Sequence, residues 1–199
     1  APTIAYIFDD SNAKILFVDR ELYDVASEAL SIASVSPKIV LINDSFASSA
    51  PDVSADILDY ESLVENGDPL YNWTMPSDEW SPLSLSYTSG TTGKPKGVVY
   101  HHRGSYLMSM GTVVGWNLPN HPIYLYSVPL FHCNGWGHAW TMAALAGTVV
   151  CLRSFDPEKV FALLDEYRVT HFGGAPIMLN MLANAPKEIK NHLIGKSKS

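Results

Sequence analysis

Charged residues, cysteines and long apolar runs are all scarce in this sequence of 199 residues. Only 17% of the residues are charged, the net charge is −7, and no basic stripe is visible. A nucleic acid bound through its phosphates is therefore not an expected partner. The two cysteines, Cys133 and Cys151, are too few for a disulfide framework, and both stand in apolar-leaning stretches. We expect them to be buried, reduced thiols of a cytoplasmic protein.

Membrane and secretion signals are also lacking. The longest apolar stretch, residues 139–152, contains a glycine and is shorter than the roughly 20 residues that a membrane-spanning helix needs. The N-terminus carries Asp9 and Asp10 but no basic segment, so it is not a secretory signal. It also lacks an initiator methionine, from which we expect the chain to begin within a longer protein. The 47% of hydrophobic residues is ample for a packed core.

Short apolar strands alternate with amphipathic helices along most of the chain. Strands joined by helices of this length usually lie parallel, with right-handed crossovers. The pattern predicts an α/β fold, layered αβα with largely parallel sheets. Strands are expected at 14–19, 38–44, 97–102, 122–130, 148–152 and 169–174, and helices at 3–11, 20–30, 59–66, 103–117, 138–146, 156–167 and 175–185.

Two segments fall outside this alternation. Residues 44–84 are rich in proline, serine and aspartate, which indicates a long surface connection. We expect its aromatic side chains, Tyr71, Trp73 and Trp80, to hold it against the body of the protein. The lysines of residues 187–199 indicate a solvated tail.

The stretch "SYTSGTTGKPKG", residues 86–97, could connect two strands or hold a phosphate. Consecutive small residues let backbone N–H groups converge on an anion, and the hydroxyls and two lysines add donors and charge. The same residue types also make turns, so composition leaves both interpretations open. The length of the stretch favours the phosphate interpretation, because a plain hairpin needs only two to five linking residues.

Several better-known sites are excluded by spacing. Gly90 and Gly93 are too close together for the P-loop of NTPases, and the strand pattern after Gly97 does not suit a dinucleotide-binding turn. The stretch is not a G-x-S-x-G nucleophile motif. His132, Cys133 and His138 lack the paired spacing of a closed zinc site.

Residues 87–99, "YTSGTTGKPKGVV", resemble the signature of the adenylate-forming, or AMP-binding, enzymes. Residues 127–137, "SVPLFHCNGWG", resemble the strand and turn of that family whose histidine lies beside the nucleotide, and residues 171–182 resemble its strand and helix beside the acyl pocket. The resemblance runs from residue 14 to about residue 185. Within the family, the chain most resembles short- and medium-chain acyl-CoA synthetases, a group that includes 3-methylmercaptopropionate-CoA ligases.

The resemblance implies a role for each matched residue. His132 would lie against the adenylate and the substrate carboxylate as the catalytic histidine, and the hydroxyl of Thr88 would help to position Mg²⁺. Trp136 would match an aromatic residue that gates the acyl tunnel in some fatty-acyl relatives. The residues implied to hold the phosphates of ATP are Thr88, Ser89, Gly90, Thr91, Thr92, Gly93, Lys94, Pro95 and Lys96, and those implied to border the acyl or pantetheine channel are Gly173, Gly174, Ala175 and Pro176.

The resemblance also implies that the chain is an internal fragment of the family's N-terminal domain. Residues 1–83 would be the end of a first αβα half with its connecting loop, and residues 84–199 the phosphate loop and part of a second half. The family's downstream glutamate and lysine and its C-terminal domain are not in these residues, so the fragment alone is expected to be inactive. The implied partners of the complete enzyme are a carboxylic acid, ATP and CoA, and a homodimer stays open. The alternative is a non-catalytic module that binds a nucleotide or another anion.

Overall fold

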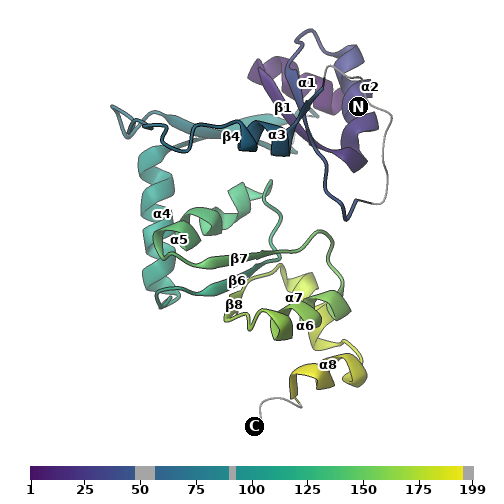
Figure 1. Cartoon of the computed structure of the whole chain (residues 1–199), viewed down its shortest axis with the longest axis vertical. Coiled ribbons are helices and arrows are strands. Elements are labelled where there is room, and N and C mark those ends of the chain that lie inside the picture. Colours follow the sequence, from purple (N-terminus) through teal and green to yellow (C-terminus); the bar gives the residue numbers. More distant parts are fainter. Residues whose placement is uncertain (48–56, 90–92, 195–199) are drawn as a thin grey trace. The chain divides into compact units, whose positions relative to one another are not determined.

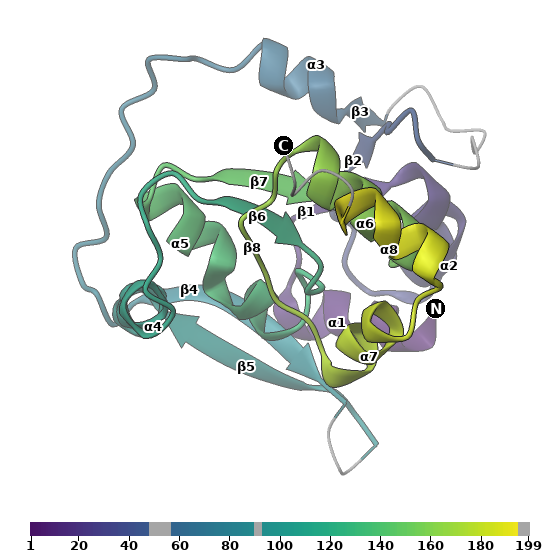
Figure 2. The same cartoon turned by 90° about the horizontal axis from the view of Figure 1, so that it is seen from below.

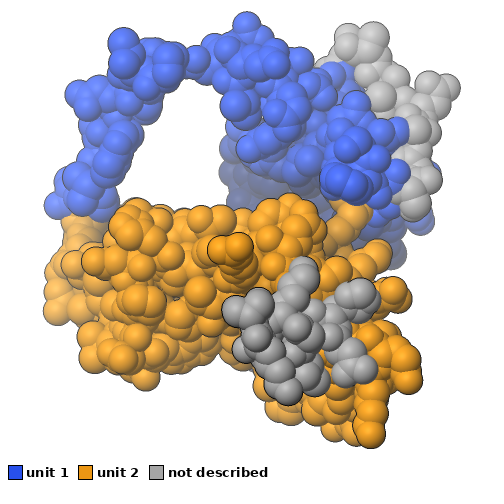
Figure 3. Space-filling view, turned by 60° about the horizontal axis from the view of Figure 1, so that its bottom comes forward, with its two compact units in different colours: residues 1–77, 87–98 blue, residues 78–86, 99–199 orange. Residues whose placement is uncertain are grey.

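The computed structural model describes residues 1–47, 57–89 and 93–194. The chain divides into two compact units (Figure 3). Unit 1 consists of residues 1–77 and 87–98, and unit 2 consists of residues 78–86 and 99–199. Helices alternate with strands through most of both units, as Figure 1 shows. Each unit is described by itself below.

The sheet of unit 1 is parallel. Strand β1 (Ile15–Asp19) pairs with β2 (Lys38–Ile42), and β2 pairs with β3 (Leu58–Asp59). Helices α1 (Pro2–Ser11) and α2 (Tyr23–Ile32) flank β1 in the sequence, with a short 3₁₀ helix, η1 (Arg20–Leu22), before α2. Helix α3 (Tyr60–Glu65) follows β3 and is capped by the Asp59 carboxylate, which accepts a hydrogen bond from the amide of Ser62.

The core of unit 1 lies between its two longer helices and one face of the sheet. Ala5 and Phe8 of α1 pack with Ala29 of α2, and Val18 of β1 packs with Ala26 and Leu41 in a neighbouring cluster. Ile15 and Phe17 of β1 point to the face opposite Val18, and each is 54% exposed. This strand therefore buries alternate positions, as expected for a sheet covered more fully on one face than on the other.

The sheet of unit 2 is also parallel and has β6 (Ile123–Tyr126) at its centre, between β7 (Thr148–Cys151) and β8 (His171–Phe172). Tyr124 and Leu125 have no exposed surface, whereas on the edge strand β7 only Val150 is buried. The central strand thus supplies the core of the unit.

Helices cover both faces of this sheet (Figure 1). On one face Tyr124 and Tyr126 pack with Met142 of α5 (His138–Ala144), beside α4 (His102–Gly115). On the other face Leu125 packs with Val160 of α6 (Pro157–Glu166) and with Leu182 of α7 (Pro176–Ala183). The alternation of β6 side chains between these two clusters confirms the predicted αβα layering.

Strands β4 (Pro82–Thr88) and β5 (Lys96–His101) form a separate two-stranded sheet. In unit 2, the segment before β4 is tied to the start of α4. Arg103 forms an exposed ion pair with Glu79 and lies 5.6 Å from the ring centroid of Trp80, which stacks on His101.

Three expectations from the sequence are wrong. Cys151 is exposed, because β7 is an edge strand and its ends are not covered. Tyr71 and Trp73 are 74% and 70% exposed, so they do not hold the connection against the protein. Residues 187–194 form helix α8 (Lys187–Ile194), which packs beside α6 (Figure 2), rather than a solvated tail.

Candidate active site

In unit 2 the candidate site residues gather where the parallel strands end. The Ser127 hydroxyl, just after β6, donates a hydrogen bond to the Gly173 carbonyl, just after β8. This contact joins the carboxyl ends of two neighbouring strands. Ligands of open α/β sheets bind outside that edge, so the position suits the role expected of Gly173.

A turn rich in glycine follows β6 and carries the predicted gate residue. The 3₁₀ helix η2 (Cys133–Gly137) contains three consecutive residues with left-handed φ: Gly135 at 59°, Trp136 at 57° and Gly137 at 68°. Glycine adopts this region freely, whereas for tryptophan it is strained. Trp136 is half-buried in this conformation.

Close contacts explain why glycines flank Trp136. The Tyr126 hydroxyl donates a 2.9 Å hydrogen bond to the Gly135 carbonyl, and a Cβ at Gly135 would lie 2.1 Å from that hydroxyl oxygen. A Cβ at Gly137 would lie 2.2 Å from Cε of Met108 on α4. Glycine at 135 therefore lets the turn pack against Tyr126 of β6, and glycine at 137 adopts its left-handed φ beside α4 without strain.

His132 occupies the N-cap position of η2, and its side chain is exposed. The turn around it is closed by two backbone hydrogen bonds, from its amide to the Pro129 carbonyl at 3.1 Å and from the Gly135 amide to its own carbonyl at 2.9 Å. The imidazole is thus presented at the surface of unit 2 by an ordered turn.

Behind the turn, four aromatic rings pack together. His138, at the start of α5, is 2% exposed, and its ring centroid lies 4.9 Å from that of Trp116, 4.8 Å from that of Tyr124 and 6.1 Å from that of Trp136. A Cβ at Gly173 would touch three of these residues, at 3.3 Å from Trp116, 3.4 Å from Tyr124 and 3.6 Å from Trp136. The structure therefore brings Trp136 and Gly173 together, as candidates for one pocket wall.

The other three predicted channel residues, Gly174, Ala175 and Pro176, come directly after Gly173 in the sequence. Gly174 is half-buried, and a Cβ there would make ordinary contacts with Leu179 and Met178. Ala175 is the N-cap of α7, and Pro176 is its first residue, where the missing N–H costs no hydrogen bond. Both side chains are exposed.

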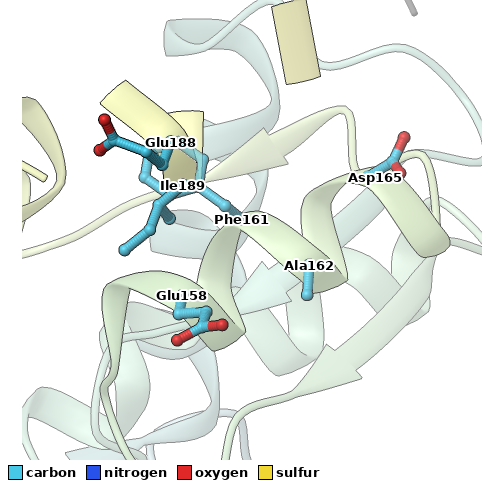
Figure 4. Close-up of a pocket in the computed structure, with 6 residues that line it drawn as sticks. All are labelled: Glu158, Phe161, Ala162, Asp165, Glu188 and Ile189. Atoms are coloured by element: carbon cyan, nitrogen blue, oxygen red, sulfur yellow. The ribbon is translucent and has the colours of Figure 1, made fainter. Parts of the chain in front are cut away.

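A mainly apolar cavity of about 590 Å³ lies along the segment that leads from β6 to His132. Its lining includes Ser127, Leu130, Phe131, Cys151, Phe155 and Met178. A smaller pocket of about 360 Å³ lies between α6 and α8 (Figure 4), and contains none of the predicted site residues. Its carboxylates, from Glu158, Asp165 and Glu188, do not suit an anionic ligand.

The predicted phosphate loop belongs to unit 1. Thr88 is the last residue of β4 and Lys96 the first of β5, and both are exposed, as are Ser89, Gly93 and Lys94. Gly93 has a left-handed φ of 89° with open space around its Cα, and Pro95 is half-buried. The predicted residues Gly90, Thr91 and Thr92 lie outside the described residues.

Helix α1 holds the strand that leads into this loop. The Tyr87 hydroxyl donates a 2.8 Å hydrogen bond to one carboxylate oxygen of Asp10, and the Tyr6 hydroxyl donates to the other at 3.3 Å. Nζ of Lys94 lies 5.3 Å from the centroid of the Tyr6 ring. Partial burial, the hydrogen bond to Asp10 and the charge of that carboxylate raise the pKa of Tyr87 to about 12.

Sequence reasoning missed these supporting residues. Tyr6 and Asp10 are one helical turn apart on α1, which indicates only a shared face, and nothing in the sequence connects that face to a loop 77 positions later. For His138 the sequence suggests only a zinc ligand, which the spacing excludes, and gives no sign of its aromatic neighbours. Within residues 1–47, 57–89 and 93–194, no set of three or more His, Cys, Asp or Glu side chains could hold a metal ion.

No helix in the described part of the chain combines the length and apolarity required to cross a bilayer.

Comparisons with known proteins agree with the fold and motifs. The family model described as "AMP-binding enzyme" matches residues 1–197. The chain is 39% identical over 200 residues to acetate/butyrate–CoA ligase AAE7 of Arabidopsis thaliana, which is named as peroxisomal, and 42% identical over 198 residues to acetate–CoA ligase CCL3 of Humulus lupulus. Each alignment covers 94% of this chain but only 35% of the relative, so the chain spans about a third of their length.

Solved structures of other proteins share the fold. The N-terminal domain of FACL13 from Mycobacterium tuberculosis matches with a TM-score of 0.73 at 23% identity, over 94% of this chain and 44% of that one. The luciferase-like enzyme of the mealworm Zophobas morio matches with a TM-score of 0.75 at 22% identity, over 94% of this chain and 42% of that one. At these identities the likeness concerns the fold alone.

Proposed function

The chain belongs to the family of AMP-binding enzymes, and on that premise we propose that the complete protein is an ATP-dependent acyl-CoA synthetase. It would activate a short- or medium-chain carboxylic acid as the acyl adenylate and transfer the acyl group to CoA. The chain described here would supply the phosphate loop and part of the acyl pocket of that enzyme.

The observation that carries the proposal is the loop of residues 88–96. It joins two paired strands, its described residues Thr88, Ser89, Gly93 and Lys94 are exposed, and it bears two cationic side chains. Gly93 is in the left-handed conformation that lets backbone amides turn toward an anion. In this proposal the residues from Thr88 to Lys96 hold the β- and γ-phosphates of ATP.

The proposed first step joins two anions. A carboxylate oxygen of the acid attacks the α-phosphorus of ATP, the bond from that phosphorus to the bridging oxygen breaks, and pyrophosphate leaves with the electron pair. Lys94, Lys96 and the loop hydroxyls would stabilise the charge that develops on the leaving group. His132, exposed on its ordered turn, would lie against the substrate carboxylate and lower the cost of bringing the anions together.

The second step transfers the acyl group. The CoA sulfur forms a bond to the carbonyl carbon of the adenylate, AMP leaves with the electrons of the broken C–O bond, and the thiol proton is released. Trp136, Gly173, Gly174, Ala175 and Pro176 would border the channel through which the acyl chain and the pantetheine arm approach.

A magnesium ion fits this site only as part of an ATP complex. Mg²⁺ is commonly held by substrate phosphates and water with one or two protein oxygens, and the exposed Thr88 hydroxyl could serve as one of these. When bound, the ion would neutralise charge on the phosphates.

The proposed substrate class follows from the relatives' names. Relatives of the chain include acetate/butyrate, acetate and 2-methylpropanoate CoA ligases, all named for short acids. We keep the cytoplasm as the proposed compartment, although one relative is named peroxisomal. The division at residue 83, between a first αβα half and the start of a second, and a homodimer of the complete enzyme also stay proposals.

Acid-dependent exchange of labelled pyrophosphate into ATP, measured with the complete protein, tests the function. The proposal predicts exchange with at least one short or medium-chain acid, and formation of AMP and a thioester when CoA is added. ATP binding without exchange for any acid would favour the alternative of a non-catalytic nucleotide-binding module.

A further inference from the structure

His138 is a buried polar side chain without a hydrogen-bond partner. It is 2% exposed, and neither Nδ1 nor Nε2 has a partner among the described residues. Burial lowers the pKa of His138, so the ring is neutral at neutral pH and offers one N–H donor and one nitrogen acceptor. Leaving such buried groups unsatisfied destabilises the fold. An apolar ring would fill the same space without that cost, so packing alone does not account for a histidine here.

Tyr124 brings a second hydrogen-bonding group to the same place. Its side chain is fully buried, its ring centroid is 4.8 Å from that of His138, and its hydroxyl has no hydrogen-bond partner among the described residues. Burial raises the pKa of Tyr124, and the nearby Gly173 backbone opposes that shift without forming a hydrogen bond of ordinary geometry. The hydroxyl therefore stays protonated, both a donor and an acceptor.

These two side chains lie directly behind the wall of the proposed acyl channel. A Cβ at Gly173 would lie 3.4 Å from the Tyr124 hydroxyl oxygen and 3.6 Å from Cζ3 of Trp136. Trp136 is half-buried in a strained left-handed conformation and packs edge-on against His138. A ligand beside Gly173 would reach these two polar groups only if the indole of Trp136 rotates about its side-chain bonds.

We propose that the acyl pocket ends in a polar floor, where His138 and Tyr124 hydrogen-bond a hydroxyl group on the acyl chain, so that the preferred substrates are hydroxy acids. This inference rests on the proposed CoA-ligase function. A hydroxyl can donate to the unprotonated imidazole nitrogen and accept from the tyrosine O–H. A methyl group in its place would leave both protein groups unpaired. The four rings of this cluster, Trp116, Tyr124, Trp136 and His138, carry no charge at neutral pH that could pair with an ionised group.

Matched pairs of acids test the proposal in the complete protein. Each pair differs only by a hydroxyl in place of a methyl, for example 3-hydroxybutanoate against 3-methylbutanoate and 4-hydroxybutanoate against pentanoate. The rate measured is acid-dependent pyrophosphate exchange. For at least one pair, kcat/KM is expected to favour the hydroxy acid by about tenfold or more. A preference for the methyl partner in every pair would overturn the proposal.

Two variants test whether Tyr124 and His138 cause the preference for hydroxy acids. Tyr124→Phe removes only the hydroxyl, and His138→Phe keeps an aromatic ring in the cluster. Each is expected to reduce the hydroxyl-to-methyl ratio of kcat/KM by about tenfold, whereas Trp80→Phe, an exposed control outside the cluster, keeps the wild-type ratio. An unchanged ratio in Tyr124→Phe and His138→Phe would place recognition elsewhere and overturn the proposal.

The outcomes distinguish a failure of the polar floor from a failure of the proposed CoA-ligase function. If His138→Phe does not fold, the hydroxyl-to-methyl ratios of Tyr124→Phe and of the wild type still test the polar floor. Exchange with plain acids but no hydroxyl preference refutes the polar floor alone. Absence of exchange with any acid refutes the proposed function, and the polar floor with it.

Discussion

The hydroxyl of Tyr87 donates a 2.8 Å hydrogen bond to the carboxylate of Asp10, a residue 77 positions earlier in the chain. Tyr87 immediately precedes the loop proposed to hold phosphate, and Asp10 is near the end of α1. The same carboxylate accepts a hydrogen bond from Tyr6, whose ring lies under the ammonium group of Lys94. Helix α1 therefore contacts both Tyr87, just before the loop, and Lys94, within it.

Tyr87→Phe and Asp10→Asn should each destabilise the protein by about 1 kcal/mol, because each weakens the same hydrogen bond. The double variant should cost little more than the larger single effect, since the two changes share one interaction. Urea unfolding of the complete protein, followed by fluorescence, measures these differences. Tyr71→Phe is the control, because Tyr71 is 74% exposed, and it should change stability by less than about 0.5 kcal/mol. Fully additive losses would contradict the coupling.

The raised pKa of Tyr87 makes this contact sensitive to alkali. The folded-state pKa of about 12 lies above the ordinary value of 10.0, so folding favours the neutral phenol. The stabilisation is fully present below pH 10.0 and is lost as the pH rises through about 12. Absorbance titration of tyrosinate, as the difference between wild type and Tyr87→Phe, should reveal this late-titrating group. Asp10→Asn should move its pKa down, and a Tyr87 that titrates with the exposed tyrosines in wild type would refute the assignment.

Gly137→Ala should be destabilising, by about 1–2 kcal/mol. The main cause is the φ of 68°, where alanine is strained, whereas the 2.2 Å contact of a Cβ with Cε of Met108 can be relieved by movement of that flexible side chain. Gly111→Ala is a matched control in the interior of α4, where the space is open, and it should be neutral or stabilising by up to about 1 kcal/mol. Chemical denaturation of both variants checks the contrast. Equal effects would show that the turn tolerates a side chain.

Trp136→Ala should change the preference of the complete enzyme among acids of different chain length. The indole is half-buried against Gly173 and His138, so its removal opens space at the proposed channel wall. The ratio of kcat/KM for longer and shorter acids should rise severalfold, at about 1 kcal/mol or more per additional methylene that the pocket can bury. Trp73→Ala, which alters a 70% exposed indole, should leave the ratio unchanged. If the ratio for longer and shorter acids were unchanged in Trp136→Ala as well, Trp136 would have a structural role only.

Local signals in the sequence identified most of the fold. The helix expected at residues 156–167 is present as α6, and its start is capped by the Asp156 carboxylate, which accepts a 2.9 Å hydrogen bond from the Glu158 amide. The strand expected at residues 122–130 is present as β6, but it ends at Tyr126, and residues 127–130 lie in the segment that leads to His132. The two-residue strand β3, Leu58–Asp59, was missed, because two residues carry no periodicity and their pairing depends on β2.

Other features depend on tertiary position, which local patterns do not contain. "TVVC" has the composition of a buried strand, yet Cys151 is exposed because β7 lies at the edge of its sheet. The lysines of α8 indicated a solvated tail, but the segment forms a short helix. Its Ile189 and Phe161 of α6 line the same pocket (Figure 4). The glycine-rich loop was visible as a motif, but its support by Asp10 could not be inferred, since the contact joins segments far apart in sequence.

The central claim is that residues 88–96 hold the phosphates of ATP, and pyrophosphate exchange in the double variant Lys94→Ala/Lys96→Ala of the complete protein tests it most directly. Removing two cations from the proposed site should reduce acid-dependent exchange by about a hundredfold or more, at roughly 1.5–3 kcal/mol for each charged hydrogen bond lost. Lys159→Ala, an exposed lysine on α6, should keep wild-type exchange. Wild-type exchange in the double variant would show that the phosphates bind elsewhere.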